Sequence, residues 1–255
     1  MTAADRGRSA VDLGSDLHTH STLTDGTADP DAMADAAAAA GLHTWGLSDH
    51  VRADSDWVGD YAVRVRALRR PGLTIRCGVE AKILDAAGRL DLPSRLPRLD
   101  YVLVADHQYP GADGPVGPRD MRERLAAGRL DAAAVVAGLV EATCRAVALA
   151  PYPAIVVHPF SLLPKMGLDE DDVTDEHRTR LAEACLRADA AIEVNEKWRT
   201  PTRHTVAFLL AAGVRVVAGS DAHATTAVGA WDHALAVLGT LPPAAVTATE
   251  VGASR

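Results

Sequence analysis

Seven short apolar runs alternate with helix-forming segments along this chain, and no other feature constrains its fold as strongly. The first run begins at Val11–Leu13 and leads to Asp16; the others are Thr44–Leu47, Leu73–Val79, Tyr101–Val104, Ala154–Val157, Ala190–Val194 and Val214–Ala218. Strands that alternate with helices pair in parallel through helical crossovers, and parallel strands covered on both faces read as continuous apolar runs. The pattern therefore predicts an α/β fold, a closed or nearly closed barrel of seven βα units.

The segments between these runs carry signals for helix ends. Asp29 is a good N-cap before Pro30, and Gly41 ends the helix that they begin. Further helices are expected at 57–70, within 118–149, and at 174–187, 201–213 and 227–238. No Gly-x-Gly-x-x-Gly follows the first strand, which disfavours a dinucleotide-binding sheet. We expect a single barrel domain over residues 15–242, an N-terminal extension over 1–14 and a C-terminal tail over 243–255.

The composition of the chain limits which partners it is expected to bind and in which cellular compartment it is expected to act. A net charge of −8 over 255 residues disfavours binding to long nucleic acids, which need a basic surface. Cys77, Cys144 and Cys185 are far apart and form no Cys-x-x-Cys pair, which is typical of reduced thiols in a cytoplasmic protein. No apolar run looks long enough to cross a bilayer, and the first residues lack the apolar core of a signal peptide. The sequence carries no pattern that specifies an oligomeric state.

Metal-ligating residue types follow most of the predicted strands. His18 and His20 lie two apart in a strand, so both imidazoles point to one face and suit one transition metal. The later strand ends carry His50, Glu80, His107, His158, Asn195, Asp221 and His223. In βα barrels these ends meet on one rim, where active sites lie, so the pattern predicts a metal site. His43, His177, His204 and His233 lie elsewhere and are expected to have hydrogen-bonding or solvent-exposed roles.

These motifs together resemble those of a known family. The segments Asp16-Leu17-His18-Thr19-His20-Ser21, Ser48-Asp49-His50, Gly78-Val79-Glu80 and Gly219-Ser220-Asp221-Ala222-His223, with the strand-end His107 and His158, are similar to the motifs of the PHP (polymerase and histidinol phosphatase) family. The resemblance extends from about residue 15 to 240. It implies a distorted seven-stranded, TIM-like (β/α)7 barrel.

The resemblance also implies a set of metal ligands for two or three divalent ions. They are His18, His20, Asp25, His50, Glu80, His107, His158, Asp221 and His223. Asp25 is identified only through the resemblance, from the turn Thr24-Asp25-Gly26, and Glu80 is expected to bridge two ions. Imidazole and carboxylate ligands fit Zn, Mn or Fe. Asp106 departs from the family, which often has a small or hydroxyl residue before this histidine; it could perturb the site or support a ligand.

Two metal ions that lie close together can generate hydroxide from water. They can also hold both the attacking and the leaving oxygen of a displacement reaction. The resemblance therefore implies a metal-dependent phosphoesterase, with the attacking hydroxide held near Glu80, His107 and His158. The expected substrate is a small phosphorylated metabolite, a phosphomonoester such as histidinol phosphate. No Gly-x-Ser-x-Gly or cysteine-centred motif suggests a protein nucleophile.

Cationic and aromatic side chains near the predicted rim are candidates for substrate contacts. The polar candidates are Arg52, Lys82, Lys165, Asn195, Lys197 and Arg199, and Arg199 is favoured because an arginine can grip phosphate with two donors. The aromatic candidates are Trp57, Tyr109, Phe160 and Trp198, in or near the loops at 54–61, 108–121, 161–172 and 197–204. Glu193 shares a strand face with Asn195, and both could support ligands or fill the barrel.

Three other functions remain open at this point. One is a phosphodiesterase or nuclease on nucleoside phosphates or short oligonucleotides, although the 29 residues between His50 and Glu80 leave no room for an inserted domain. Another is a non-catalytic metal-binding PHP module. The third is an amidohydrolase, a barrel family that also has His-x-His on its first strand but often bridges its metals with a lysine on strand four. Here strand four ends in His107, which favours phosphoesterase chemistry.

Overall fold

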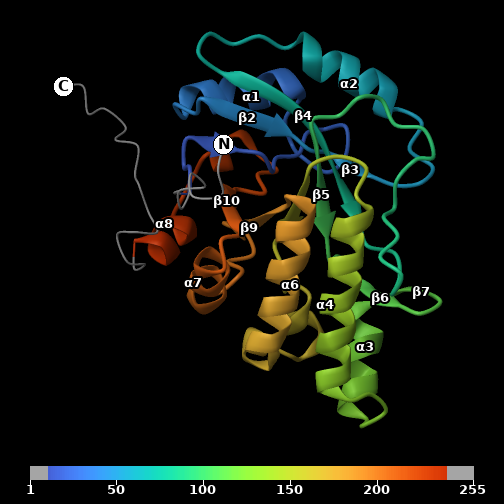
Figure 1. Cartoon of the computed structure of the whole chain (residues 1–255). Helices are drawn as coiled ribbons and strands as arrows, with labels where there is room; N and C mark the ends of the chain where they lie inside the picture. The colour runs from blue at the N-terminus through green and yellow to red at the C-terminus, as the bar shows by residue number, and fades with distance from the viewer. Residues whose placement is uncertain (1–10, 240–255) are drawn as a thin grey trace.

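A parallel sheet that curls into a nearly closed barrel organises the chain. The computed structural model describes residues 11–239, and the sheet order is β1-β2-β4-β5-β8-β9-β10, with β3 paired to β4 (Figure 1). These strands are Ser15–Asp16, Thr44–Leu47, Thr74–Lys82, Tyr101–Ala105, Ala154–Val157, Ala191–Asn195, Arg215–Gly219 and, for β3, His50–Val51. The predicted seven-stranded barrel is confirmed. The short β3 was not predicted, and residues 1–10 of the expected extension and the 243–255 tail lie outside the described residues.

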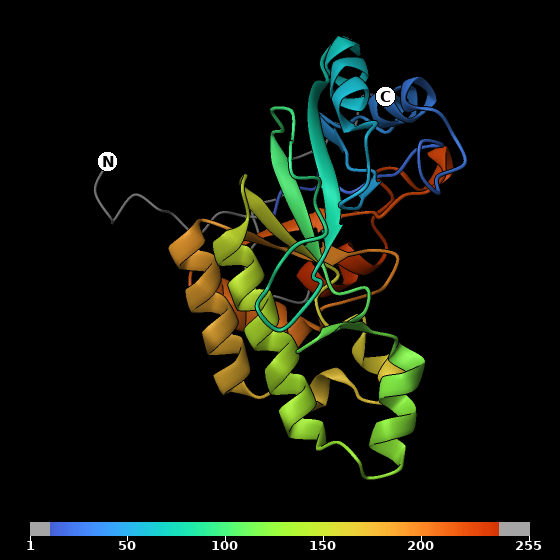
Figure 2. The same cartoon turned by 90° about the vertical axis from the view of Figure 1, so that its right-hand side faces the viewer.

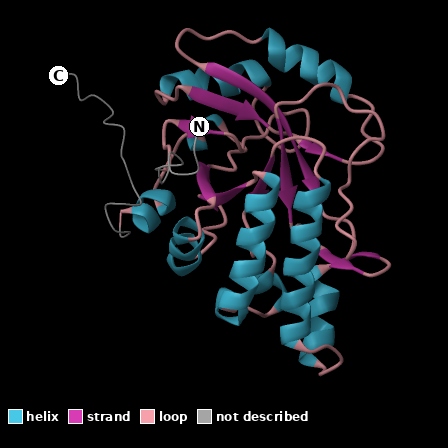
Figure 3. Cartoon of the chain, in the orientation of Figure 1, coloured by secondary structure: helices cyan, strands magenta, loops and turns pink. Residues whose placement is uncertain are grey.

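The helices lie outside this sheet, and most of them cover its outer face (Figure 3). They are α1 (Pro30–Ala39), α2 (Val58–Ala67), α3 (Pro118–Ala126), α4 (Ala132–Leu149), α5 (Leu163–Met166), α6 (Asp175–Ala188), α7 (Arg203–Ala211) and α8 (His233–Leu238). Asp29 caps α1 as predicted, and Thr174 caps α6; each accepts a hydrogen bond from a backbone N–H of the first turn. The segment at 108–121, predicted as a loop, contains a small hairpin of β6 (Tyr109–Gly111) and β7 (Gly114–Val116).

Two helix starts differ from the prediction for identifiable reasons. Helix α7 begins at Arg203 because the side chain of Thr202 caps it, and Pro201 lies before the cap. The last helix was predicted from Ala227, but α8 begins at His233. The carboxylate of Glu196 accepts hydrogen bonds from the backbone N–H groups of residues 232, 233 and 234 at 2.7–3.1 Å, which fixes the start of α8 there. Helix α2 is also shorter at both ends than the predicted 57–70.

Helix α4 corrects the expectation that no segment of the chain is long and apolar enough to cross a bilayer. Its 18 residues have a mean hydropathy of 1.7, so by length and composition alone it could cross a bilayer. It is the one described helix of which this is true. Figure 2 shows α4 beside α6 along one side of the sheet, and Val136, Leu139 and Ala142 on its inner face are fully buried. Its apolar residues therefore serve the packing of this domain.

The barrel interior below the rim is filled with side chains. Leu103, Ala105, Ile155 and Val157 form a cluster there with the ring of Tyr101. The Tyr101 hydroxyl donates a hydrogen bond of 2.7 Å to the carbonyl of Leu17. A Cβ atom at Gly78 would come within 2.3 Å of the tyrosine ring, so this glycine makes room for it. The filled interior gives the rim a rigid floor.

The join between β1 and β10 is closed mainly at one point. Thr19 and Ala222 form an isolated parallel bridge, in which His20 donates from its backbone N–H to the Ala222 carbonyl at 2.8 Å. Below it, the buried carboxylate of Asp16 accepts hydrogen bonds from the backbone N–H groups of residues 18, 220 and 229 at 3.1–3.3 Å. Asp16 therefore connects the first strand to the segments after the last strand.

We expect Asp16→Ala to destabilise the metal-free protein by about 3 kcal/mol. The substitution leaves up to three buried backbone donors without an acceptor, and each such loss costs about 1–3 kcal/mol. Urea unfolding of chelator-treated protein measures the change. The exposed Asp113 in the β6–β7 turn provides a control, and Asp113→Ala should leave the midpoint nearly unchanged. Equal midpoints for the two variants would show that Asp16 does not hold the join.

Candidate metal centre

The carboxylate of Glu80 lies at the centre of a histidine cluster on the carboxyl rim of the barrel. Its Oε1 atom is 3.0 Å from the Nε2 atoms of both His107 and His158. Its Oε2 atom faces three other imidazoles, at 2.7 Å from His50 Nδ1, 3.4 Å from His20 Nε2 and 3.6 Å from His18 Nε2. The two oxygens of one carboxylate therefore face two different sets of nitrogen donors.

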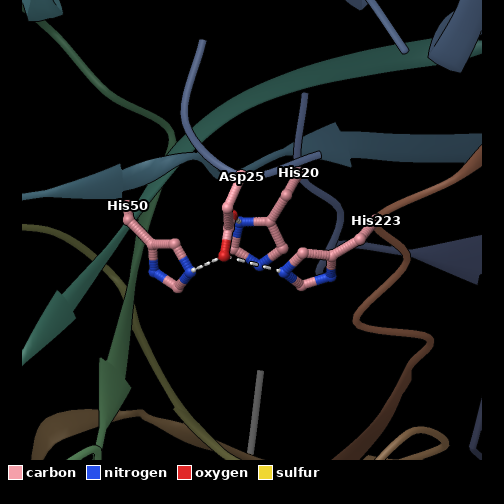
Figure 4. A group of neighbouring side chains, drawn as sticks. All are labelled: His20, Asp25, His50 and His223. Atoms are coloured by element: carbon pink, nitrogen blue, oxygen red, sulfur yellow. Dashed lines mark ion pairs between the residues drawn. The ribbon is translucent and has the colours of Figure 1, made fainter. Parts of the chain in front are cut away.

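Asp25 brings a second group of donors together at the mouth of the site (Figure 4). Its Oδ2 atom is 3.3 Å from Nε2 of both His50 and His223, and the His20 ring lies behind it. Ligand atoms of these four residues lie within 4.8 Å of one another. Asp25 is half exposed, because it lies on a turn and not at a strand end.

Asp49 holds the turn that carries Asp25. Its carboxylate accepts hydrogen bonds from the backbone N–H of Ser21 at 2.8 Å, from the Ser21 hydroxyl at 2.7 Å and from the Thr24 hydroxyl at 2.6 Å. Gly26 completes the turn, since a Cβ atom there would be 2.5 Å from the His20 carbonyl oxygen. The Ser-Asp-His motif thus contributes one candidate ligand, His50, and one residue that positions another.

Asp221 completes the cluster from the other side. Its Oδ1 atom lies 3.6 Å from His20 Nε2 and 3.8 Å from His18 Nε2. His18, His158 and Asp221 also form a group with ligand atoms within 4.8 Å of one another. All nine ligands expected from the resemblance are therefore brought together in overlapping groups, from β3, β4 and the segments after β1, β5, β8 and β10.

The donor atoms of this cluster fit divalent transition metals. His18 Nε2 and both ring nitrogens of His20 are buried without a hydrogen-bond partner among the described residues. Burial lowers the pKa of His20 well below its usual value, so its imidazole is neutral and can offer a lone pair. Burial would raise the pKa of Glu80, but the imidazoles of His107 and His18 outweigh burial and hold it well below its usual value. Burial would also lower the pKa values of His18, His50 and His158, but the neighbouring carboxylates outweigh burial and raise them, so a metal ion would displace protons from these imidazoles. Imidazole and carboxylate are the ligand types of Zn, Mn or Fe.

Glu193 supports two of the histidines from beneath. Its Oε1 atom is 2.7 Å from His18 Nδ1, and its Oε2 atom accepts hydrogen bonds from the His158 backbone N–H at 2.7 Å and the Asn195 amide at 2.9 Å. Such a contact leaves Nε2 of His18 directed into the cluster. Gly219 gives this carboxylate its space, because a Cβ atom there would be 1.8 Å from Glu193 Oε1.

Asp106 has the supporting role that the sequence left open. Its Oδ1 atom lies 3.3 Å from His158 Nδ1, and Oδ2 accepts a hydrogen bond of 3.1 Å from the backbone N–H of Phe160. The Ser161 hydroxyl donates a further hydrogen bond to Oδ1 at 3.1 Å. The carboxylate thus fixes the ring of His158 and the turn that follows it.

A cavity of about 770 Å³ opens above the cluster. Of the candidates for substrate contacts, the lining includes Arg52, Trp57, Lys82, Lys165, Lys197 and Trp198. It also includes Ser55, Asp91 and Gln108, which the sequence did not indicate because they lie in irregular segments without a motif. The loops at 54–61, 108–121, 161–172 and 197–204 each contribute to this lining.

The other candidates lie away from the lining of this cavity. Asn195 is buried, and its Oδ1 atom accepts a hydrogen bond of 2.8 Å from the Trp198 backbone N–H, so it shapes the loop below the cavity. Arg199 is exposed beyond that loop at a φ of 57°. Phe160 and Tyr109 pack with the main core.

The cations of the cavity differ in their surroundings. Lys197 Nζ lies 3.3 Å from Asp221 Oδ1 and 3.1 Å from His223 Nδ1, beside the cluster. Lys165 Nζ lies 3.7 Å above the centre of the Trp198 ring. Burial lowers the pKa of Lys165, and the charge of Lys197 contributes in the same direction. A positive charge held in this way favours an anion in the cavity.

The four remaining histidines lie outside these donor groups. His43 and His204 are 58% and 64% exposed. His177 closes a capping box at the start of α6, and His233 is the first residue of α8.

Known proteins resemble this chain in sequence and in fold. Residues 16–111 match the model of the PHP domain. A probable phosphatase from Caldanaerobacter subterraneus subsp. tengcongensis is 28% identical over 247 residues, which cover 91% of this chain and 85% of that protein. A probable phosphatase from Acetivibrio thermocellus is 28% identical over 236 residues, covering 88% of this chain and 85% of that protein.

Two solved structures share the fold. A putative histidinol phosphatase from Listeria monocytogenes has a TM-score of 0.64 at 15% identity, covering 84% of this chain and 97% of its own. The histidinol phosphate phosphatase of Lactococcus lactis subsp. lactis, solved with Zn, L-histidinol and phosphate, has a TM-score of 0.63 at 13% identity. That alignment covers 91% of this chain and 94% of the Lactococcus chain.

We expect metal ions to stabilise the protein through this cluster. A ligand that binds only the folded state at 1,000 times its dissociation constant adds about 4 kcal/mol, which raises the melting temperature by several degrees. Thermal unfolding of chelator-treated protein with added Zn²⁺ or Mn²⁺ measures this, and elemental analysis counts the bound ions. His20→Ala should lose most of the shift, whereas the exposed His204→Ala should keep it. A shift of the same size in both variants would place the binding elsewhere.

Proposed function

We propose that the chain is a member of the PHP family and a metal-dependent phosphatase that hydrolyses a small phosphate monoester. One observation carries the proposal: imidazole and carboxylate donors converge on Glu80 at the floor of a cavity whose walls hold four cationic side chains. The donors suit metal ions, and the cations suit the phosphate. The probable phosphatases that align with most of the chain support the same reaction class.

In this proposal the nine clustered side chains hold two or three divalent ions, of Zn, Mn or Fe. The residues are His18, His20, Asp25, His50, Glu80, His107, His158, Asp221 and His223. Glu80 would contribute a ligand to two of the ions, because its two oxygens face different imidazoles. When bound, such ions activate water and stabilise the charge of the phosphoryl group.

The other side chains of the site orient these groups and receive the substrate. Glu193 and Asp106 each hold one nitrogen of a histidine, so that the other nitrogen faces the cluster. Lys165 and Lys197 neutralise the phosphate from the wall that carries Trp198, and Asn195 acts by holding the Trp198 loop. Arg199 is not assigned a phosphate contact, because it lies outside the cavity lining.

The size and charge of the site favour a metabolite over a polymer. The Lactococcus structure holds L-histidinol and phosphate, which supports a small phosphate ester as the substrate class. A net charge of −8 disfavours a long nucleic acid. We place the enzyme in the cytoplasm, because its three cysteines are unpaired and unpaired thiols are typical of a reducing compartment.

Phosphate release from p-nitrophenyl phosphate tests the proposal. We expect activity that chelation abolishes and Mn²⁺ or Zn²⁺ restores, with little turnover of the matching diester. Glu80→Gln and His158→Ala should each lower kcat/KM by about 100-fold or more, since each removes a donor from the metal cluster. His204→Ala serves as the control. Full activity in either cluster variant would contradict the assignment.

A second variant separates phosphate binding from metal binding. We expect Lys165→Met to raise KM and lower kcat/KM by about tenfold, because it removes a charge worth about 1.5–3 kcal/mol while an apolar stem stays over Trp198. The metal content should remain that of the unaltered protein. An unchanged KM would remove Lys165 from the phosphate site.

A further inference from the structure

The chain contains three lysines, and all three line the cavity above the metal centre. They are Lys82, Lys165 and Lys197, whereas the other 23 basic residues are arginines. Among the arginines, Arg52 lines the cavity. Outside the cavity the protein therefore uses arginine at every basic position, and inside it uses the compact, strongly hydrated ammonium group of lysine. This distribution points to a ligand that several ammonium groups contact.

Arg52 and Lys82, here called the outer pair, each lie two residues beyond a candidate metal ligand, His50 of β3 and Glu80 of β4. In the parallel pairing of these strands His50 is opposite Glu80 and Val51 is opposite Ala81, so Arg52 follows beside Lys82. Lys82 is two residues beyond Glu80, which places it on the same face of β4 and about 6–7 Å further along the strand. The pair is thus displaced outward from the carboxylate that centres the cluster.

The outer pair is held in position but keeps an excess of positive charge. Lys82 Nζ lies 3.1 Å from Gln108 Oε1 and 3.6 Å from Asp91 Oδ2. The other oxygen of Asp91 accepts a hydrogen bond of 2.7 Å from the backbone N–H of Ala53, next to Arg52. Within residues 11–239 no carboxylate lies within ion-pair distance of Arg52. In the described part of the chain, this wall therefore has two cations, and its carboxylate pairs with Lys82 alone.

Lys165 and Lys197 occupy a different part of the rim. They follow β8 and β9, and Lys197 is within 3.3 Å of candidate metal ligands. Figure 1 shows β3 and β9 on opposite sides of β5. The cavity therefore has one cationic pair beside the metal centre and another on the facing wall, with Trp57 and Trp198 also in its lining.

We infer that the substrate carries a second anionic group, a carboxylate or another phosphate, which Arg52 and Lys82 bind while the scissile phosphate lies at the metal centre. This inference rests on the proposed function. Apart from the candidate metal ligands, the lining has four cations and the carboxylate of Asp91. Arg52 and Lys82 lie on a wall where Asp91 is the one carboxylate among the described lining residues outside the candidate metal ligands, so a second anion is favoured there and an ammonium group is repelled.

The inference separates this site from one suited to an amino alcohol. L-Histidinol, the alcohol in the Lactococcus complex, carries an amino group that is protonated at neutral pH. Such a group would meet Arg52 and Lys82 in this cavity. We therefore expect histidinol phosphate to be a poorer substrate here than an ester of an anionic alcohol.

Phosphonates of one chain length test the inference by binding alone, because the C–P bond resists hydrolysis. The probes are propylphosphonate, aminopropylphosphonate, phosphonopropanoate and propane bisphosphonate, and calorimetry on the metal-loaded protein gives each dissociation constant. We expect the two doubly anionic probes to bind at least about tenfold more tightly than propylphosphonate, and the amino probe to bind most weakly. The carboxylate and bisphosphonate arms show which second anion is preferred.

Substitution of Arg52 and Lys82 tests whether these two residues cause the preference for probes with a second anionic group. The double variant Arg52→Gln with Lys82→Gln should bring the doubly anionic probes to within about threefold of propylphosphonate, while propylphosphonate itself binds as before. Arg95→Gln, at an exposed position outside the lining, is the matched control and should keep the full preference. A preference that survives in the double variant would overturn the assignment.

Lysine footprinting gives an independent readout, since each modified lysine can be located by mass spectrometry. Propylphosphonate should protect Lys165 and Lys197 from an amine-reactive label, and Lys82 should be protected only by probes with a second anion. Equal affinity for all four phosphonates, with phosphate release intact, would refute the second-anion site but leave the phosphatase. Absence of phosphate release from any ester would instead refute the proposed function.

Discussion

The ion pairs of one buried carboxylate determine much of this structure. Glu80 is almost fully buried, with five imidazoles around it at 2.7–3.6 Å. So many histidines in one buried place would repel one another if protonated, and they would leave nitrogens unsatisfied if neutral. The arrangement is consistent as a set of ligands, and it requires a scaffold stiff enough to hold the rings in place. The packed interior around Tyr101 and the supporting carboxylates of Glu193 and Asp106 supply that stiffness.

The candidate ligands that could be predicted from the sequence are those whose positions follow from the alternation of side chains along a strand or from the end of a strand. His18 and His20 are two residues apart just after β1 and both face Glu80, and this convergence follows from parallel strands that end on one rim. Asp25 lies on a turn, where side chains do not alternate in direction as they do along a strand. Only the resemblance to a family therefore identified it. Asp91 and Gln108 lie in irregular segments, where the spacing of residues says nothing about the direction of a side chain.

Other differences arise from long-range contacts that local sequence signals do not include. The start of α8 is set by Glu196, which lies some 36 residues earlier in the chain. Arg199 is close in sequence to the lining residue Trp198, but the backbone turns at a positive φ and carries it outside. The apolar character of α4 reflects its burial against α6 and the sheet, which hydropathy alone cannot distinguish from burial in lipid.

The closure of the barrel gives the metal centre a mechanical role. Between the segments that follow β1 and β10, the described backbone is linked by the Thr19–Ala222 bridge and by a hydrogen bond from Thr27 to the His223 carbonyl, and Asp16 spans the gap below them. The candidate ligands His18 and His20 stand on one side of that gap, and Asp221 and His223 stand on the other. An ion bound by residues from both sides of the gap would link the beginning of the barrel to its end. Such an ion can bind all of these residues only after the intervening 200 or so residues have folded, so metal binding would be a late folding event.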